Sequence, residues 1–139
     1  MAAGYSGTPL AKKLGIKPGA RVALVDAPDG AEALLDPLPD GVSLRRQARA
    51  PLDVILFFAT ERRVVERRFL ELGRRLEPDG SLWLSWPKKA SKVQTDITED
   101  VLREVILPSG LVDTKVCAVD ETWSGLRFVW RKELRPQPA

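Results

Sequence analysis

The sequence predicts a single three-layer α/β domain built around a mostly parallel sheet. Segments 22–25, 54–59 and 82–86 are apolar almost without interruption. Strands covered on both faces show this pattern, whereas half-exposed strands alternate apolar and polar residues. Other elements, among them an amphipathic helix, separate these runs, and right-handed crossovers then place helices on both faces. With the expected strands numbered one to six, we predict the order 2-1-3-4-6-5, with the last strand antiparallel.

The elements between the apolar runs differ in character. AEALL (31–35) favours a short helix, and VSLRR (42–46) is short and polar enough for an edge strand. After the run at 54–59, four apolar residues fall at i, i+4, i+7 and i+11, as one stripe of an amphipathic helix: Val65, Phe69, Leu72 and Leu76. We expect residues 78–80, Pro-Asp-Gly, to end this helix and turn the chain into the run at 82–86.

A second helix is indicated by TDITEDVLREVILPSG. Two caps are compatible with its start: a capping box of Asp96 with Glu99, or Thr98 as the cap with acidic residues in the first turn. We expect Pro108 and Gly110 to end it. Its buried stripe would comprise Val101, Leu102, Val105 and Ile106.

Segments 112–120 and 126–132 alternate and predict an antiparallel hairpin, with ETWSG as its turn. The alternation places one set of residues together on a face: Val112, Thr114, Val116 and Ala118. Cys117, on the other face, is interpreted as a small buried thiol. Trp123 at the turn is either an anchor for a partner or, the favoured interpretation, folded back onto its own sheet.

Composition excludes several kinds of chemistry. The 139 residues contain no histidine and one cysteine, so Ser-His-Asp and Cys-His catalysis, an internal disulfide and multi-cysteine metal sites are all ruled out. No apolar run approaches the roughly 20 residues that span a bilayer, and the N-terminus has no secretory h-region. We therefore expect a cytoplasmic protein, with one domain over residues 1–134 and a disordered tail over 135–139.

Labile residues are scarce. Asparagine is absent, Met1 is the sole methionine, and there are 11 prolines. This bias predicts high thermal stability, although GC-rich coding favours a similar composition.

Longer segments of the sequence resemble those of two known protein families. KLGIKPGARVALVDAPDG and RRLEPDGSLWLSWP resemble the first-strand lead-in and the later helix, turn and strand of class I methyltransferases. Over nearly its whole length the chain also resembles a small bacterial family described as a domain of unknown function. The segments that carry this second likeness are AGYSGTPLAKKLGIKPG, WPKKASKVQTDITEDVLRE and GLVDTKVCAVDETWSGLRFVWRK. Both resemblances imply a Rossmann-like fold, and the second brings no established reaction.

The methyltransferase resemblance implies a glycine-rich loop after the first strand and an acidic residue after the second, both for S-adenosylmethionine. Here the loop is DAPDG (26–30), in which Gly30 is the only glycine and Pro28 lacks an amide donor. The second strand ends in Arg-Arg-Gln at 45–47. The G-x-G-x-x-G fingerprint and the Walker A loop are also absent. We therefore expect no bound cofactor, no metal and no identifiable catalytic residue.

Two clusters are candidate ligand sites. Lys88, Lys89, Ser91 and Lys92 follow the strand at 82–86 and lead to a helix start, a combination that suits an anion. The alternative, which we favour, is a solvated loop.

Asp26, Asp29 and Gly30 lie where open α/β sheets bind ligands, at the carboxyl end of a strand. The two aspartates are equally suited to capping the helix at 31–35, and the cap is the favoured interpretation.

Six arginines between the second and third apolar runs resemble a nucleic-acid patch: Arg62, Arg63, Arg67, Arg68, Arg74 and Arg75. Three i,i+4 pairs favour a solvated helix face instead: Arg62 with Glu66, Arg67 with Glu71, and Glu71 with Arg75.

Three hypotheses for function follow. The first is a non-catalytic, methyltransferase-like module that binds an anionic small ligand or a protein partner. The second is an S-adenosylmethionine-dependent methyltransferase with an atypical cofactor loop. The third, which we favour least, is an RNA-associated protein using Arg45, Arg46, Arg49 and the loop lysines.

Overall fold

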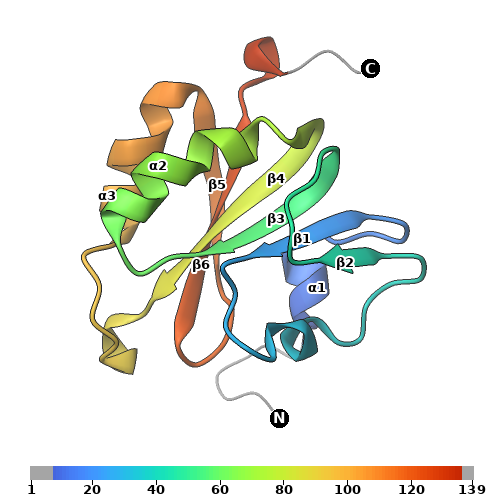
Figure 1. Cartoon of the computed structure of the whole chain (residues 1–139), viewed down its shortest axis with the longest axis horizontal. Coiled ribbons are helices and arrows are strands. Elements are labelled where there is room, and N and C mark those ends of the chain that lie inside the picture. Colours follow the sequence, from blue (N-terminus) through green and yellow to red (C-terminus); the bar gives the residue numbers. More distant parts are fainter. Residues whose placement is uncertain (1–7, 136–139) are drawn as a thin grey trace.

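The computed structural model describes residues 8–135 and contains a six-stranded sheet in the order β2-β1-β3-β4-β6-β5 (Figure 1). The predicted order is confirmed. Strands β1 to β4 run parallel, and β6 is antiparallel to both β4 and β5, as predicted for the last strand. The strands span Arg21–Val25 (β1), Ser43–Arg45 (β2), Leu52–Phe58 (β3), Leu76–Pro87 (β4), Leu111–Ala118 (β5) and Trp123–Trp130 (β6).

The two outer layers are unequal. Helices α2 (Arg62–Gly73) and α3 (Glu99–Ile106) cover one face of the sheet, as Figure 1 shows. Among the described residues, the helices on the other face are the four-residue α1 (Leu10–Lys13) and the 3-10 helix η1 (Ala31–Leu35). The three-layer prediction is confirmed, but the second outer layer is thin.

Strand β3 shows why the continuous apolar runs are buried. Ile55 and Phe57 point into the core under α2 and α3, while Leu56 and its same-face neighbours point into the core under α1 and η1. All of these side chains are buried. Since fully burying one large apolar side chain stabilises by about 1.5–3 kcal/mol, a run buried on both faces fixes β3 at the centre of the sheet.

The chain leaves α2 earlier than predicted. Val65, Phe69 and Leu72 form the buried stripe, but the helix ends at Gly73, and Leu76 instead opens β4 by pairing with Leu52. The turn predicted at 78–80 lies within the first part of β4, next to a register shift. A Cβ atom on Gly80 would lie 3.1 Å from three backbone carbonyl oxygens, so glycine allows this close crossing.

Of the two caps considered for α3, Thr98 is confirmed, because its hydroxyl accepts from Val101 N at 3.1 Å. The capping box with Asp96 is wrong. The Asp96 carboxylate accepts from Arg62 N at 2.7 Å and thereby satisfies an amide at the start of α2. The helix ends at Ile106, and Gly110 adopts a left-handed conformation beyond a 3-10 turn, as expected.

The hairpin of β5 and β6 is confirmed, with two corrections. Its turn is Val119–Thr122, closed by the Asp120 carboxylate, which accepts from the amides of Thr122 and Trp123 at 2.8 Å. Trp123 therefore begins β6, and its ring packs edge-on against Phe58 with centroids 5.1 Å apart. The fold-back interpretation of Trp123 is confirmed.

The second correction concerns the faces of β5. An irregularity between Asp113 and Lys115 breaks the alternation, so Val112 opposes Val129 while Lys115 opposes Arg127. Val112 therefore shares a face with Lys115, not with Val116 as predicted. An extra residue at a bulge shifts the phase of everything beyond it.

No helix in the described part of the chain is long and apolar enough to cross a membrane. Apart from Arg135, the predicted tail lies outside the described residues.

Candidate functional site at the carboxyl edge of the sheet

The strand order places a topological switch point between β1 and β3. The chain leaves β1 toward β2 on one side and leaves β3 toward β4 on the other. Ligands of open α/β sheets bind in the crevice beyond the carboxyl ends of the strands at such a point. Three segments meet this edge in Figure 1: residues 26–30 after β1, 60–61 after β3 and 88–92 after β4.

The first residue beyond β1, Asp26, forms an ion pair with a residue of helix α2. Asp26 has a positive φ of 53°, and its carboxylate accepts from Arg68 Nη1 on α2 at 2.5 Å. The Arg68 guanidinium also lies 5.6 Å from the centre of the Phe57 ring. The expectation that Asp26 or Asp29 caps η1 is wrong, because the cap position is Gly30, with φ 80° and no side-chain cap.

A second arginine closes the same loop from the other side. Arg46, which follows β2, donates from Nη1 to the carbonyl of Ala27 at 2.8 Å and from Nη2 to that of Pro28 at 3.0 Å. Its guanidinium also makes two hydrogen bonds to the Glu32 carboxylate, at 2.7 and 2.9 Å. These hydrogen bonds lower the pKa of Glu32 to about 2. The loop after β1 is thus closed by the chain's own cation.

These residues do not fit S-adenosylmethionine bound in the manner the methyltransferase resemblance implies. That manner needs backbone close to the cofactor after β1 and a carboxylate after β2. Here the guanidinium of Arg46 follows β2 and engages the carbonyls of Ala27 and Pro28. A donor stands where an acceptor for ribose hydroxyls is needed.

The lysine loop, residues 88–92, is held by the hairpin turn and by the hydroxyl of Ser91. Lys88 N donates to Thr122 O at 2.8 Å, and the Ser91 hydroxyl donates to Lys88 O at 2.6 Å while accepting from Val93 N at 3.2 Å. Among the described residues, no ion pair involves Lys88, Lys89 or Lys92. Ser91 therefore shapes the turn, and the three ammonium groups have no carboxylate partner within residues 8–135.

The two predicted clusters share the edge but do not join. In the described part of the chain, no hydrogen bond or ion pair links residues 26–30 to residues 88–92. The carboxylate of Asp26 is taken by Arg68, and the strand β3 lies between β1 and β4. The predicted ligand residues thus form two separate surfaces.

Sequence reasoning missed a pocket of about 460 Å³ between these surfaces, lined by Thr60, Glu61, Gln94, Thr95 and Asp96. The Thr95 hydroxyl donates to Thr60 O at 2.6 Å and accepts from Ile97 N at 3.1 Å, which ties the start of α3 to the end of β3. The position of Thr60 and Glu61 directly after an apolar run was the available signal, the same one that identified Asp26.

The arginine patch is mostly a network of ion pairs. Arg62 with Glu66 and Glu71 with Arg75 form the expected i,i+4 pairs, at 3.1 and 2.6 Å. The pair expected between Arg67 and Glu71 is wrong, because Glu71 contacts Arg75.

Cys117 on β5 is half-buried, and burial raises the pKa of its thiol.

Comparison with known proteins gives structures but no sequence relatives. No protein-family model matches the chain, and no curated protein does. A methyltransferase dependent on S-adenosylmethionine, from Aquifex aeolicus, superposes with a TM-score of 0.61 at 15% identity, covering 86% of each chain. Magnesium protoporphyrin IX methyltransferase from Synechocystis PCC 6803, with bound S-adenosylhomocysteine, gives 0.58 at 12% identity over 88% of this chain and 79% of that one. The fibrillarin pre-rRNA processing protein of Methanococcus jannaschii gives 0.51 at 12% identity, over 83% and 68%.

The chain therefore has the fold of the class I methyltransferases. Identities this low establish the fold and nothing finer. Membership of the small bacterial family stays a prediction.

Proposed function

We propose that this protein is a methyltransferase-like binding module that does not transfer methyl groups, and that it holds an anionic small ligand or a protein partner at the carboxyl edge. The observation that carries the proposal is Arg46. Its guanidinium joins the carbonyls of Ala27 and Pro28 and the Glu32 carboxylate, in the loop that would receive a methyl donor.

A cofactor entering this loop in the usual way would have to displace Arg46 from all three groups. The Glu32 carboxylate would then lose its cationic partner, and the two carbonyls would need new donors. Hydrogen bonds to charged groups stabilise more than those between neutral groups, although solvent weakens them where they are exposed, as these are. The arrangement thus favours a closed loop over an open cofactor site.

The ligand class follows from the lysine loop. Lys88, Lys89 and Lys92 have no carboxylate partner among the described residues, on the edge where such folds bind ligands. Three closely spaced ammonium groups attract anions by charge, without the directional recognition that an arginine fork supplies.

A second function is a methyltransferase with an atypical cofactor loop. The structural neighbours favour it over the binding module, because several of their names describe methyltransferases. The pocket at Thr60, Glu61 and Asp96 also lies beside the switch point and is large enough for a small substrate.

Titration with S-adenosylmethionine, by calorimetry and by thermal unfolding, separates these two functions. A ligand at 100 times its Kd stabilises the folded state by about 2.7 kcal/mol, which is a shift of several degrees in a domain of this size. We expect no saturable heat and no shift for the parent protein. Saturable binding of S-adenosylmethionine would contradict the binding-module proposal and support the methyltransferase.

Arg46→Ala sharpens the test. If Arg46 closes the loop, the variant is the form most able to accept S-adenosylmethionine. Lys89→Ala, at the same edge but outside the loop, is the matched control. Binding by the parent and by both variants alike would show that Arg46 does not obstruct the cofactor.

A further inference from the structure

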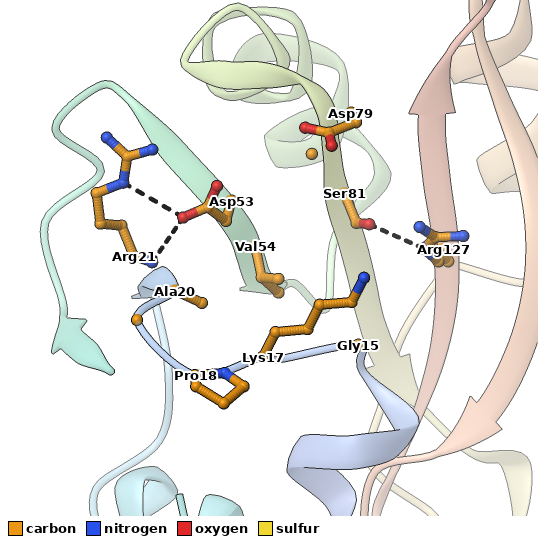
Figure 2. Close-up of a pocket in the computed structure, with 12 residues that line it drawn as sticks. Gly15, Lys17, Pro18, Ala20, Arg21, Asp53, Val54, Asp79, Ser81 and Arg127 are labelled. Carbon is orange, nitrogen blue, oxygen red and sulfur yellow. Dashed lines mark hydrogen bonds and ion pairs between the residues drawn. The ribbon is translucent and has the colours of Figure 1, made fainter. Parts of the chain in front are cut away.

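A groove of about 510 Å³ lies at the opposite, amino-terminal edge of the sheet (Figure 2). The turn after α1 forms its floor through residues 15–20, and the first residues of β1 and β3 form one wall. Residues 79–81 of β4 and Arg127 of β6 form the other wall. The volume lies within the range of sites for small molecules. No part of the carboxyl-edge site contributes to it.

The cation in the wall formed by β1 and β3, Arg21, is paired with carboxylates. Asp53 accepts from the amide of Arg21 at 2.8 Å and from its Nε at 3.3 Å. Glu77 accepts from Arg21 Nη2 at 3.1 Å. Two carboxylates thus neutralise one guanidinium, and this wall has no surplus positive charge to offer a ligand.

The wall formed by β4 and β6 is different. Arg127 donates from Nε to the Ser81 hydroxyl at 2.8 Å and from Nη1 to the Thr114 hydroxyl at 3.3 Å. Both partners are neutral, and in the described part of the chain Arg127 makes no ion pair. Partial burial lowers the pKa of Arg127. The two hydroxyls thus orient a guanidinium that has no carboxylate partner among the described residues.

Lys17 adds a second cation to the same space. Figure 2 shows its side chain extending through the groove in the direction of Ser81 and Arg127. It too has no ion pair among the described residues. A planar guanidinium and an ammonium lining one groove suit an oxyanion, with the guanidinium able to bind it in a directed way.

Asp79 restricts the kind of oxyanion. Its exposed carboxylate lines the groove above Ser81 in Figure 2 and repels a doubly charged group such as phosphate. The same carboxylate accepts a hydrogen bond from a hydroxyl or an ammonium group of a ligand. The acceptor Asp79 and the cations Lys17 and Arg127 together suit a ligand that carries one carboxylate and, close to it, one hydrogen-bond donor.

We propose that this groove binds a small hydroxy or amino carboxylate, with the ligand's carboxylate between Arg127 and Lys17 and its donor group toward Asp79. The site is independent of the proposed function at the carboxyl edge. Either can fail while the other stands.

The test is titration of the full-length protein with L-lactate and L-alanine at fixed ionic strength, followed by amide NMR shifts and calorimetry. Acetate, which lacks the donor, and inorganic phosphate are the comparison probes. We expect saturable shifts at residues 15–19 and 79–81 with a Kd of about 1 mM or tighter for lactate or alanine, and weaker binding of acetate and phosphate. Absence of saturable binding by lactate and alanine, or tighter binding of phosphate, overturns the proposal.

Variants assign the site. Lys17→Gln removes an exposed cation and should weaken binding about tenfold with the fold unchanged. Arg127→Gln should abolish binding, and Asp79→Asn should erase the preference over acetate. Lys132→Gln, an exposed lysine that neither lines the groove nor belongs to the lysine loop, is the matched control and should bind as the parent does. Because Arg127 also contacts Ser81 and can affect folding, the Lys17 variant decides: unchanged affinity in Lys17→Gln overturns the proposal.

Discussion

Arg127 at the amino edge of the sheet differs from the arginines that hold the loop at the carboxyl edge, because its hydrogen-bond partners are hydroxyls and not carboxylates. At the carboxyl edge, Arg46 and Arg68 are each joined to a carboxylate and draw the loop after β1 closed. At the amino edge, Arg127 donates to two hydroxyls, forms no ion pair with any described residue, and lines an open groove with Lys17. The sheet topology marks the first edge as the ligand site, yet unmatched charge in a formed groove lies at the second. The strand order thus determines which loops lie together at each edge of the sheet. The ion pairs that the side chains form there determine whether the space between those loops is filled or open.

The largest expected effect comes from Trp83, which lies on β4 between the two edges. Its side chain is fully buried, and Nε1 donates to Leu14 O at 3.1 Å, which holds the end of α1 that leads into the groove. Trp83→Ala should lower the free energy of unfolding by about 3–5 kcal/mol in urea denaturation. Trp83→Phe, which keeps most of the ring, should lose clearly less. A loss below about 1 kcal/mol for the alanine variant would mean that α1 and the groove do not depend on this contact.

Glycine substitutions compare the edges directly. Gly80→Ala should cost about 1–3 kcal/mol, because the added carbon meets three backbone oxygens at 3.1 Å beside the groove. Gly30→Ala, in the loop after β1, meets open space but retains a φ of 80°, which should cost about 1–2 kcal/mol. Urea denaturation of both variants checks the order. If Gly30→Ala is the more harmful, the carboxyl-edge loop is the more constrained of the two.

Arg46→Gln tests closure of the loop through pH. The pKa of Glu32 is about 2 in the folded protein against an ordinary value of 4.5, so its pairing with Arg46 stabilises fully above about pH 4.5. That contribution is lost as pH falls from 4.5 toward 2. The stability difference between parent and Arg46→Gln should therefore shrink over this range, in urea unfolding measured at a series of pH values. It should also shrink with added salt, because the pair is exposed. A difference independent of pH would mean that Arg46 acts through packing alone.

The smallest effect on stability is expected for the double substitution of Lys88 and Lys89 by alanine. Exposed surface changes typically alter stability by less than about 0.5 kcal/mol, so the variant should melt like the parent in buffer without added anion. It should lose any saturable stabilisation by phosphate at fixed ionic strength. Fixed ionic strength matters because such salts also strengthen apolar burial generally.

Lys17→Gln is the matched control at the other edge and should keep that stabilisation. Phosphate stabilisation that survives in the lysine-loop variant but disappears in Lys17→Gln would move the anion site to the groove. A large loss of stability without anion would instead give Lys88 and Lys89 a structural role.

The sequence alone determined the sheet. Uninterrupted apolar runs identify β1, β3 and β4 as strands buried on both faces, and alternation identifies the hairpin of β5 and β6. Burial periodicity is a local property that the residues of a strand carry themselves. The lysine loop is also predicted by the sequence, because a cluster that directly follows a buried parallel strand lies at the carboxyl edge of the sheet.

Only the tertiary structure decided which side chains form hydrogen bonds and ion pairs with one another. Asp96 looks like a cap for the helix that follows it, but it caps α2, which lies 34 residues earlier in the chain. Arg46 and Glu32 are 14 residues apart, and Arg127 meets Ser81 across 46. An ion pair or hydrogen bond depends on where two side chains meet, and sequence spacing predicts that meeting only within one helix or strand. For that reason the spacing predicts the Arg62–Glu66 pair within α2, but it predicts neither the closed loop at one edge nor the open groove at the other.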